Sequence, residues 1–351
     1  MEWSFLGERV REARLAAGLS QDRLARLVGL ERSKVAKIES GDRRVDALEL
    51  GRLATALGVP MSHFLEARPP AISRRAPLTA DTDTAGARDA YRLDARLTAW
   101  LRDVRQVVEL GDFRPAAAIT SPVPVTDAAG ARRAAGWLRT HLGLGDEPIP
   151  SLMSICARAG QLVLVTDLPG DGASLVDGDI AVAVVGLSQD PGRRRSTAAH
   201  ELGHMVLGDA YSTDLRLGVD REDLVDAFAA ELLLPVDSVR AVGDAVGRPA
   251  LVELAARYRT SWSLAVRQAE QAGVATRQGA AKLRSSTPTR VEFQEALGWT
   301  PQPDLDGVRV PPSYATAVVK AWHRRLITSS RAVELMHGQI TGEDLPEAPG
   351  A

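Results

Sequence analysis

Residues 196–204 read Ser-Thr-Ala-Ala-His-Glu-Leu-Gly-His, so that His200, Glu201 and His204 fall within five consecutive positions. On an α-helix, residues four apart lie on one face, and His200 and His204 can therefore direct their imidazoles at one point. The neighbouring residues are mostly apolar, as in a buried helix. Solvated surface histidines are the alternative, but two histidines and a glutamate in an apolar helix need polar partners. The stretch therefore predicts a buried helix that carries two metal ligands.

Neutral imidazole is a good zinc ligand, and Glu201 lies beside the face that carries both histidines. There its carboxylate can take a proton from a water whose pKa is lowered to about 7 by zinc. This chemistry hydrolyses peptide bonds at neutral pH. The spacing therefore favours a hydrolytic zinc site with Glu201 as general base, and manganese is the alternative metal.

A third metal ligand must come from elsewhere, because catalytic zinc commonly has three protein ligands and one open position. Residues 220–235 predict a second helix, since their apolar residues recur at helical spacing up to Pro235. Glu222 and Asp226 share one face of it, so one can bind metal while the other orients a ligand imidazole. Spacing favours Glu222, and Glu231 is expected to be a solvated or structural carboxylate. The acidic candidates in this helix are Glu222, Asp223, Asp226 and Glu231.

The stretches STAAHELGHMVLGD and REDLVDAFAAELLLP together resemble the ImmA/IrrE family of zinc peptidases, within the gluzincin group. The second motif of that family has a glutamate, an Asn or Asp four residues later, and then F-A-x-x-L-L-x-P. The resemblance covers residues 90 to 275 and implies a zinc metalloendopeptidase. It implies that Glu222 is the third zinc ligand, that Asp226 holds a ligand histidine, and that Glu201 is the general base. Many members carry a further acidic residue where this chain has Leu224.

The length, composition and net charge limit the number of domains and the classes of protein to which the chain can belong. The chain has 351 residues, of which 45% are hydrophobic and 25% charged, and its net charge is −2. This length allows two or three domains, and any DNA contact must depend on a local basic patch. Cys156 is the single cysteine, which excludes an intrachain disulfide. The start of the chain is too charged for a signal peptide, and no apolar run reaches the roughly 20 residues of a membrane span. We expect a cytoplasmic α+β protein that does not contact a membrane.

Residues 1–66 predict a small all-α domain. A first helix ends at Gly18, a second follows the N-cap residue Ser20 and ends at Gly29, and a third spans about 32–39. The runs SQxxLAxxVGL and xxVxxIExGxRR resemble an Xre/Cro-type helix-turn-helix domain, which implies that the third helix enters the major groove of double-stranded DNA. A protein-interaction domain with a solvated charged face is the alternative. The expected DNA contacts are Gln21, Arg32, Ser33, Lys34, Lys37, Arg43 and Arg44.

The remaining chain divides into linkers and domains. Residues 67–88 are rich in proline and small polar residues and predict a flexible linker, so the regions on either side are expected to move separately. Residues 89–275 predict a mainly helical domain with a small β-sheet. Within it, residues 161–166 and 179–185 predict two strands, which we expect to form a hairpin with a long loop. Residues 180–185 are the expected edge strand, to which an extended substrate could add. Residues 276–290 predict a second linker, and 291–351 a helical C-terminal region.

The two resemblances together imply a bacterial regulator of a stress response or a mobile element. Its first domain would bind DNA, on a palindromic site if the chain forms a homodimer, and its zinc domain would cleave a repressor protein. The repressor could be a separate protein or this chain itself, at residues 67–88. The alternative is a non-catalytic transcriptional regulator, or an antitoxin-like protein, whose metal domain senses or binds a partner. The presence of Glu201 counts against it, because a purely structural site needs no base.

Overall fold

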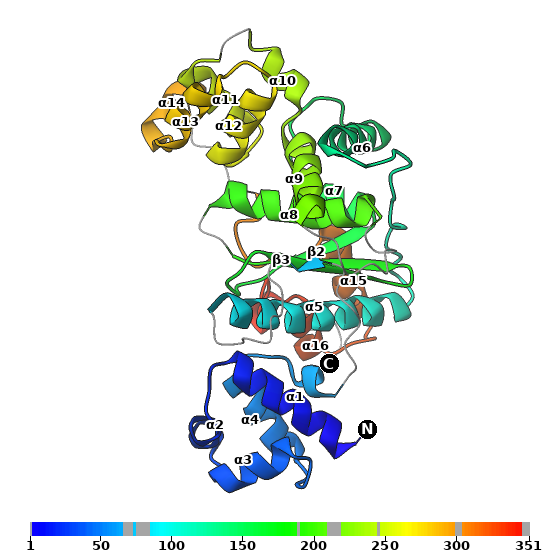
Figure 1. The fold of residues 1–351 in the computed structure, drawn as a ribbon. Coiled ribbons are helices and arrows are strands. Elements are labelled where there is room, and N and C mark those ends of the chain that lie inside the picture. Colours follow the sequence, from blue (N-terminus) through cyan, green and yellow to red (C-terminus); the bar gives the residue numbers. More distant parts are fainter. Residues whose placement is uncertain are drawn as a thin grey trace.

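The computed structural model describes residues 2–65, 73–74, 85–187, 190–208, 219–243, 246–298 and 304–345. A small helical domain formed by the N-terminal residues lies at one end of the molecule (Figure 1). A β-sheet with helices on both faces forms the middle, and a group of short helices lies at the other end. The predicted α+β class is confirmed, with an all-α N-terminal domain, a mainly helical domain around a small sheet, and a helical C-terminal region.

Four helices and a short 3-10 turn form the N-terminal domain. Ser20 caps the second helix by accepting the backbone N–H of Arg23 at 3.1 Å, and Gly29 ends it in the left-handed conformation at φ 69°. A Cβ added to Gly7 would lie 2.3 Å from the carbonyl oxygen of Ile38, so only glycine permits this approach of the first and third helices. The elements are α1 (Trp3–Ala16), α2 (Gln21–Val28), α3 (Arg32–Glu39), α4 (Ala47–Leu57) and η1 (Met61–Phe64).

A buried ion pair joins three of these helices. The guanidinium of Arg14 on α1 donates to both carboxylate oxygens of Glu39 at the end of α3, at 2.5 and 3.0 Å. The same carboxylate accepts the side-chain amide of Gln21 on α2 at 2.9 Å. The three helices are therefore held in one arrangement by a polar network as well as by apolar packing.

The N-terminal domain packs directly on the long helix that follows it, α5 (Ala85–Glu109). Tyr91 and Ala95, four residues apart on one face of α5, belong to the hydrophobic cluster of the N-terminal domain. The hydroxyl of Tyr91 lies 2.7 Å from Nε2 of His63, and both side chains are buried. The structure thus shows direct contact between the two regions, and their separate movement stays a prediction. The helix also begins inside the stretch expected as a linker, of which residues 67–72 and 75–84 lie outside the described part of the chain.

The sheet has four strands in the order β1-β3-β4-β2. The expected hairpin between residues 161–166 and 179–185 is wrong, because β2 and β4 run parallel and β3, inside the expected loop, pairs antiparallel with β4. Gly178, at φ 58°, supplies the left-handed turn between β3 and β4. The expected edge role of 180–185 is also wrong, because β4 lies between β3 and β2. The strands are β1 (Ser73–Arg74), β2 (Gln161–Val165), β3 (Gly172–Asp177) and β4 (Ile180–Val185).

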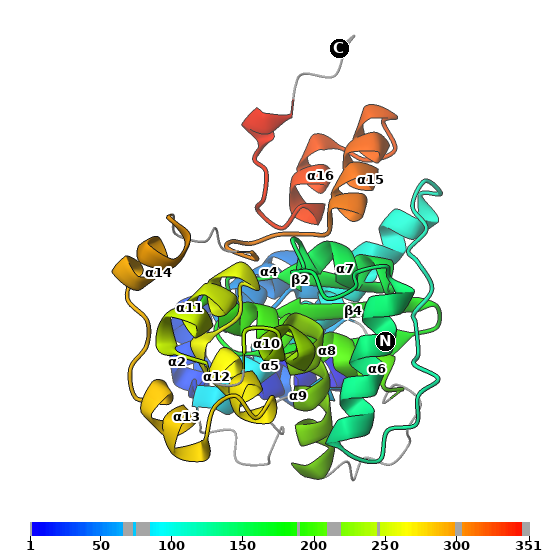
Figure 2. The same cartoon turned by 90° about the horizontal axis from the view of Figure 1, so that it is seen from above.

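Helices cover both faces of the sheet. Alternate residues of β2 and β4 point to opposite faces, so Leu162 and Val182 join one hydrophobic cluster while Val163 and Ala183 join the other. One cluster includes residues of α5, α15 (Pro312–His323) and α16 (Ser329–Leu335), and α15 and α16 lie side by side (Figure 2). The other includes residues of α7 (Leu152–Arg158) and α8 (Pro191–Val206). The C-terminal region therefore completes the core of the sheet.

The remaining helices extend from α8 to the far end of the molecule. Trp262 and Leu264 are buried there. A helix, α13, occupies most of residues 276–290, which the sequence predicts as a linker. Among the described helices, none is long and apolar enough to cross a membrane. These elements are α6 (Ala128–His141), α9 (Val219–Leu233), α10 (Val236–Arg240), α11 (Arg248–Arg257), α12 (Trp262–Gln271), α13 (Arg277–Arg284) and α14 (Arg290–Leu297), and η3 (Gly342–Asp344) lies near the end of the chain.

Candidate metal centre and DNA-binding surface

The helix α8 is anchored at its beginning by buried polar contacts. Asp190 caps it by accepting the backbone N–H of Gly192 at 2.8 Å. One turn later, the fully buried guanidinium of Arg195 forms an ion pair with Asp304 and donates to the carbonyl of Ile149 at 3.0 Å. Burial lowers the pKa of Arg195, and the charge of Asp304 opposes this shift. Arg195 therefore fixes α8 against the C-terminal region and is not a surface residue for nucleic acid.

A glycine inside the histidine motif lets α9 approach α8. A Cβ added to Gly203 would lie 2.9 Å from Cγ1 of Val225 and 3.0 Å from Cδ1 of Phe228, both on α9. Any larger residue would push the two helices apart. A glycine inside a helical pattern is a signal of close packing, and Gly203 is such a glycine. This contact brings the first turns of α9 beside the two histidines.

Three side chains from α8 and α9 converge on one point. His200 Nε2 lies 3.0 Å from Glu222 Oε2, His204 Nε2 lies 3.7 Å from Glu222 Oε1, and the two Nε2 atoms lie 3.0 Å apart. Both histidines are buried, whereas the Glu222 side chain is 44% exposed. Two imidazole nitrogens and a carboxylate are a donor set that fits zinc with an open position. Solvent reaches this group of side chains on the side of Glu222, because Glu222 is its one partly exposed member.

The other acidic residues of α9 have different surroundings. Asp226 Oδ1 lies 2.8 Å from Nδ1 of His200, which fixes the ring and leaves its Nε2 for a metal. Asp223 is exposed and is not among the converging ligands of the described residues. Glu231 accepts the backbone N–H of Val236 at 3.1 Å, and burial raises the pKa of its carboxyl. Glu231 is therefore a structural carboxylate at the junction of α9 and α10.

The carboxylate of Glu201 is fully buried between α8 and β3. Its Oε2 accepts the hydroxyl of Ser174 at 2.8 Å, and its Oε1 has no hydrogen-bond partner among the described residues. A Cβ added to Gly172 would lie 3.1 Å from Oε1 and 2.7 Å from Cγ2 of Thr197, so glycine keeps this side of the carboxylate open. Sequence reasoning missed Ser174 and Gly172, because only the pairing of β3 with the sheet brings them here.

The expected DNA contacts divide into two groups. The helix α3 lies on the side of its domain that faces away from α5 (Figure 1). Arg43 is bound by Glu49 through two hydrogen bonds, of 2.7 and 2.9 Å, which raise the pKa of its guanidinium. Gln21 donates to Glu39, as described above. The exposed members are Arg32, Ser33, Lys34, Lys37 and Arg44.

Comparisons with known families agree with both regions. Residues 6–64 match the model of a helix-turn-helix domain, and residues 156–269 match the model of a peptidase family described as an IrrE N-terminal-like domain. The chain therefore carries a helix-turn-helix domain and an IrrE N-terminal-like domain, as the two sequence resemblances predict.

Curated relatives match over a short stretch. An uncharacterized transcriptional regulator in the ATPase CF(0) region of Rhodospirillum rubrum is 41% identical over 59 residues, which are 17% of this chain and 55% of that protein. An uncharacterized HTH-type transcriptional regulator of Sinorhizobium medicae (strain WSM419) is 36% identical over 64 residues, which are 18% of this chain and 46% of that protein. The chain thus spans about half the length of these relatives, and what they share with it is limited to that stretch.

Proposed function

We propose that this chain is a DNA-binding transcriptional regulator whose second domain is a zinc-dependent endopeptidase that cleaves a repressor protein. The observation that carries the proposal is the Glu201 carboxylate, which is buried, follows His200 on the helix that carries both histidines, and has one oxygen without a hydrogen-bond partner among the described residues. A site that only stabilised the fold would not need such a carboxylate. Binding to bacterial DNA would place the protein in the cytoplasm.

In this proposal His200, His204 and Glu222 hold the metal, and Asp226 holds His200 through its Nδ1. Zinc, when bound, lowers the pKa of a water ligand to about 7 and polarises a carbonyl oxygen. Glu201 takes the proton of the attacking water on its Oε1 and later gives it to the leaving amine. Ser174 holds the other carboxylate oxygen, so the base keeps one orientation through both proton transfers.

The substrate would bind as an extended strand along β3, on the edge that β1 occupies beside Ala173 and Ser174 in the structure. This strand carries Ser174 beside Glu201, and its other neighbour in the sheet is the two-residue strand β1, in which Ser73 pairs antiparallel with Ser174. Addition of an extended peptide to a strand edge through backbone hydrogen bonds is a common mode of peptide recognition. The position of β1 therefore also favours a second substrate, the segment of this chain that joins the helix-turn-helix domain to α5.

The proposal is tested by metal-dependent cleavage. Purified protein, stripped of metal and then reloaded with zinc or manganese, is incubated alone and with candidate repressors, and the products are analysed by gel and mass spectrometry. Cleavage of a repressor, or of residues 66–84 of this chain, only after reloading supports the proposal. No cleavage of either substrate by the reloaded protein, with DNA binding intact, would favour the alternative of a non-catalytic regulator or antitoxin-like protein.

A further inference from the structure

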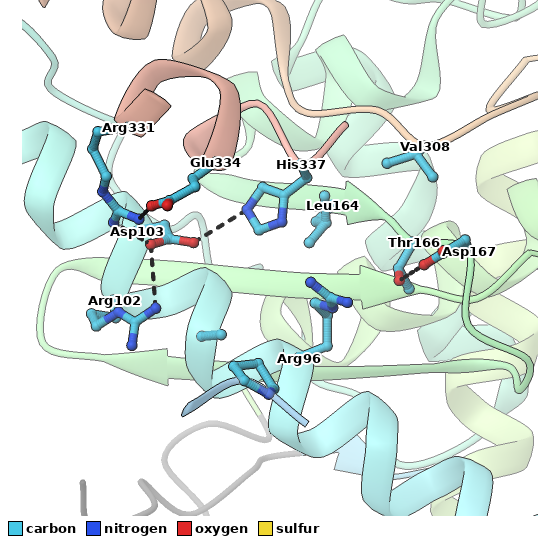
Figure 3. A pocket seen from close by; sticks show the side chains of 12 residues that line it. Arg96, Arg102, Asp103, Leu164, Thr166, Asp167, Val308, Arg331, Glu334 and His337 are labelled. Carbon is cyan, nitrogen blue, oxygen red and sulfur yellow. Dashed lines mark hydrogen bonds and ion pairs between the residues drawn. The ribbon is translucent and has the colours of Figure 1, made fainter. Parts of the chain in front are cut away.

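A second polar site lies on the opposite face of the sheet from the metal centre. It is a cavity of about 300 Å³ whose walls come from at least four segments of the chain (Figure 3). Pro60 belongs to the helix-turn-helix domain, Arg96 to α5, Thr166 follows β2, and His337 follows α16. Segments from both ends of the chain therefore meet around one cavity that is open to solvent.

Most charged groups of the cavity neutralise one another. Asp103 is buried and contacts Arg331 at 2.8 Å, His337 at 3.3 Å and Arg102 at 3.6 Å. Burial raises the pKa of Asp103, but the hydrogen bond to His337 and the charges of His337, Arg102 and Arg331 outweigh it and hold the pKa below its ordinary value. Asp103 is therefore an anion that is already satisfied by these cations.

Arg96 is the cation of this cavity that the described structure leaves without a counterion. Its side chain extends from α5 into the cavity (Figure 3), its Nε atom is buried, and that atom has no hydrogen-bond partner among the described residues. The nearby carboxylate of Asp167 belongs to an exposed residue and accepts the hydroxyl of Thr166 at 3.3 Å. A buried donor without an acceptor costs about 1–3 kcal/mol, and more when it is charged. A guanidinium that lines a cavity without a counterion among the described residues is a candidate binding group for an anion.

We propose that this cavity binds a small organic anion, whose carboxylate or phosphate group accepts hydrogen bonds from the guanidinium of Arg96. Guanidinium groups bind both anions through two parallel hydrogen bonds. The volume lies at the lower end of the range of about 300–1,000 Å³ for ligand sites, which limits the occupant to a small metabolite. The apolar walls include Pro60 and Leu164, which contact the carbon part of such a molecule.

The position of the cavity makes its occupant an effector of DNA binding. Arg96 follows Ala95, which belongs to the hydrophobic cluster of the helix-turn-helix domain, and Pro60 of that domain forms part of the wall. An anion bound here therefore contacts both the domain and the helix on which it packs. By thermodynamic linkage, a ligand that favours this packing changes DNA affinity, and DNA changes the affinity for the ligand by the same factor.

The test uses the full chain in a buffer free of phosphate and carboxylates. Inorganic phosphate, succinate and citrate are titrated separately by calorimetry, with glycine as a zwitterionic control and chloride as a control for ionic strength. We expect saturable binding of a phosphate or of a carboxylate probe, and the responding arm identifies the group. Arg96→Gln should weaken this binding about 10- to 100-fold, and Arg96→Lys should weaken it less. Arg133→Gln, at an exposed position on α6, should bind as the wild type.

Three results would overturn the proposal or its parts. An absence of saturable binding by any of the anions at millimolar concentration, in a wild type with normal helix content, would refute the anion site. Equal affinity of the Arg96→Gln variant and the wild type, at equal thermal midpoint, would also refute it. Anion binding that leaves the affinity for DNA unchanged would refute the effector role and retain the site.

Discussion

In the part of the chain that the structure describes, His200 and His337 each contact an aspartate, and their surroundings differ. Nδ1 of His200 lies 2.8 Å from Asp226, and its Nε2 faces a second imidazole and a carboxylate. Nε2 of His337 lies 3.3 Å from Asp103, which is shared with two arginines. A metal ion fits the first environment, because uncharged nitrogens converge there, whereas the arginines of the second would repel a cation. A His–Asp pair alone therefore does not identify a metal site, and the groups around the remaining ring nitrogen and the aspartate do.

The largest expected effect separates the two environments by metal content. The wild type should carry about one zinc per chain, measured by elemental mass spectrometry after gel filtration. His200→Ala and His204→Ala should lose it, because each removes one of three ligands. His337→Ala is the matched control and should keep it. Equal zinc in the wild type and the double variant His200→Ala/His204→Ala would contradict the assignment.

The second prediction compares the two aspartates. Asp226→Asn should lower zinc affinity about 10- to 100-fold, because the hydrogen bond that orients His200 and raises its basicity is weakened. Asp103→Asn should leave zinc affinity unchanged and lower the free energy of unfolding by about 1–3 kcal/mol. Competition with a chromophoric chelator measures the first quantity, and urea unfolding the second. A loss of zinc from Asp103→Asn with unchanged helix content would contradict the assignment of Asp226, and not Asp103, to the metal site.

A third prediction concerns pH. The pKa of Asp103 in the folded protein is lower than its ordinary value. An aspartate in the unfolded chain has a pKa of about 4, so the ionised Asp103 contributes its full stabilisation above about pH 4. It is lost as the pH falls through the lower, folded value. The thermal midpoint of the wild type should therefore fall more steeply below pH 4 than that of Asp103→Asn. Parallel curves for the two proteins would show that Asp103 is not held as a stabilising anion.

Two parts of the candidate metal site could be predicted from the sequence because each depends on spacing within one helix. His200 and His204 lie four apart on one helix, and so do Glu222 and Asp226 on the next. Arg96 and His337 line one cavity, but 241 positions separate them, and no local pattern joins them. The pairing of β3 with β4 was missed for a related reason. Gly172 to Asp177 is a short strand next to a turn, and its apolar residues are too few to distinguish it from a loop.

The smallest expected effects concern the helix-turn-helix domain, whose exposed and engaged residues can be compared in the same way. Arg32→Ala or Lys34→Ala should weaken specific DNA binding by about 1–3 kcal/mol if the side chain contacts a base. Arg43→Ala should weaken DNA binding less, because the guanidinium of Arg43 is already hydrogen-bonded to Glu49. Fluorescence anisotropy at several salt concentrations measures all three. Unchanged binding by the Arg32 and Lys34 variants at every salt concentration would favour a protein-interaction domain.

The role of Glu201 is the central claim, and Glu201→Gln tests it most directly. The substitution removes the base but no metal ligand, and its amide can still accept the hydroxyl of Ser174. Zinc content, DNA affinity and substrate cleavage are measured on the same preparation of this variant and of the wild type. We predict that the variant keeps its zinc and its DNA affinity and cleaves about 10²- to 10⁴-fold more slowly. Cleavage at the wild-type rate by a zinc-loaded Glu201→Gln protein would contradict the account.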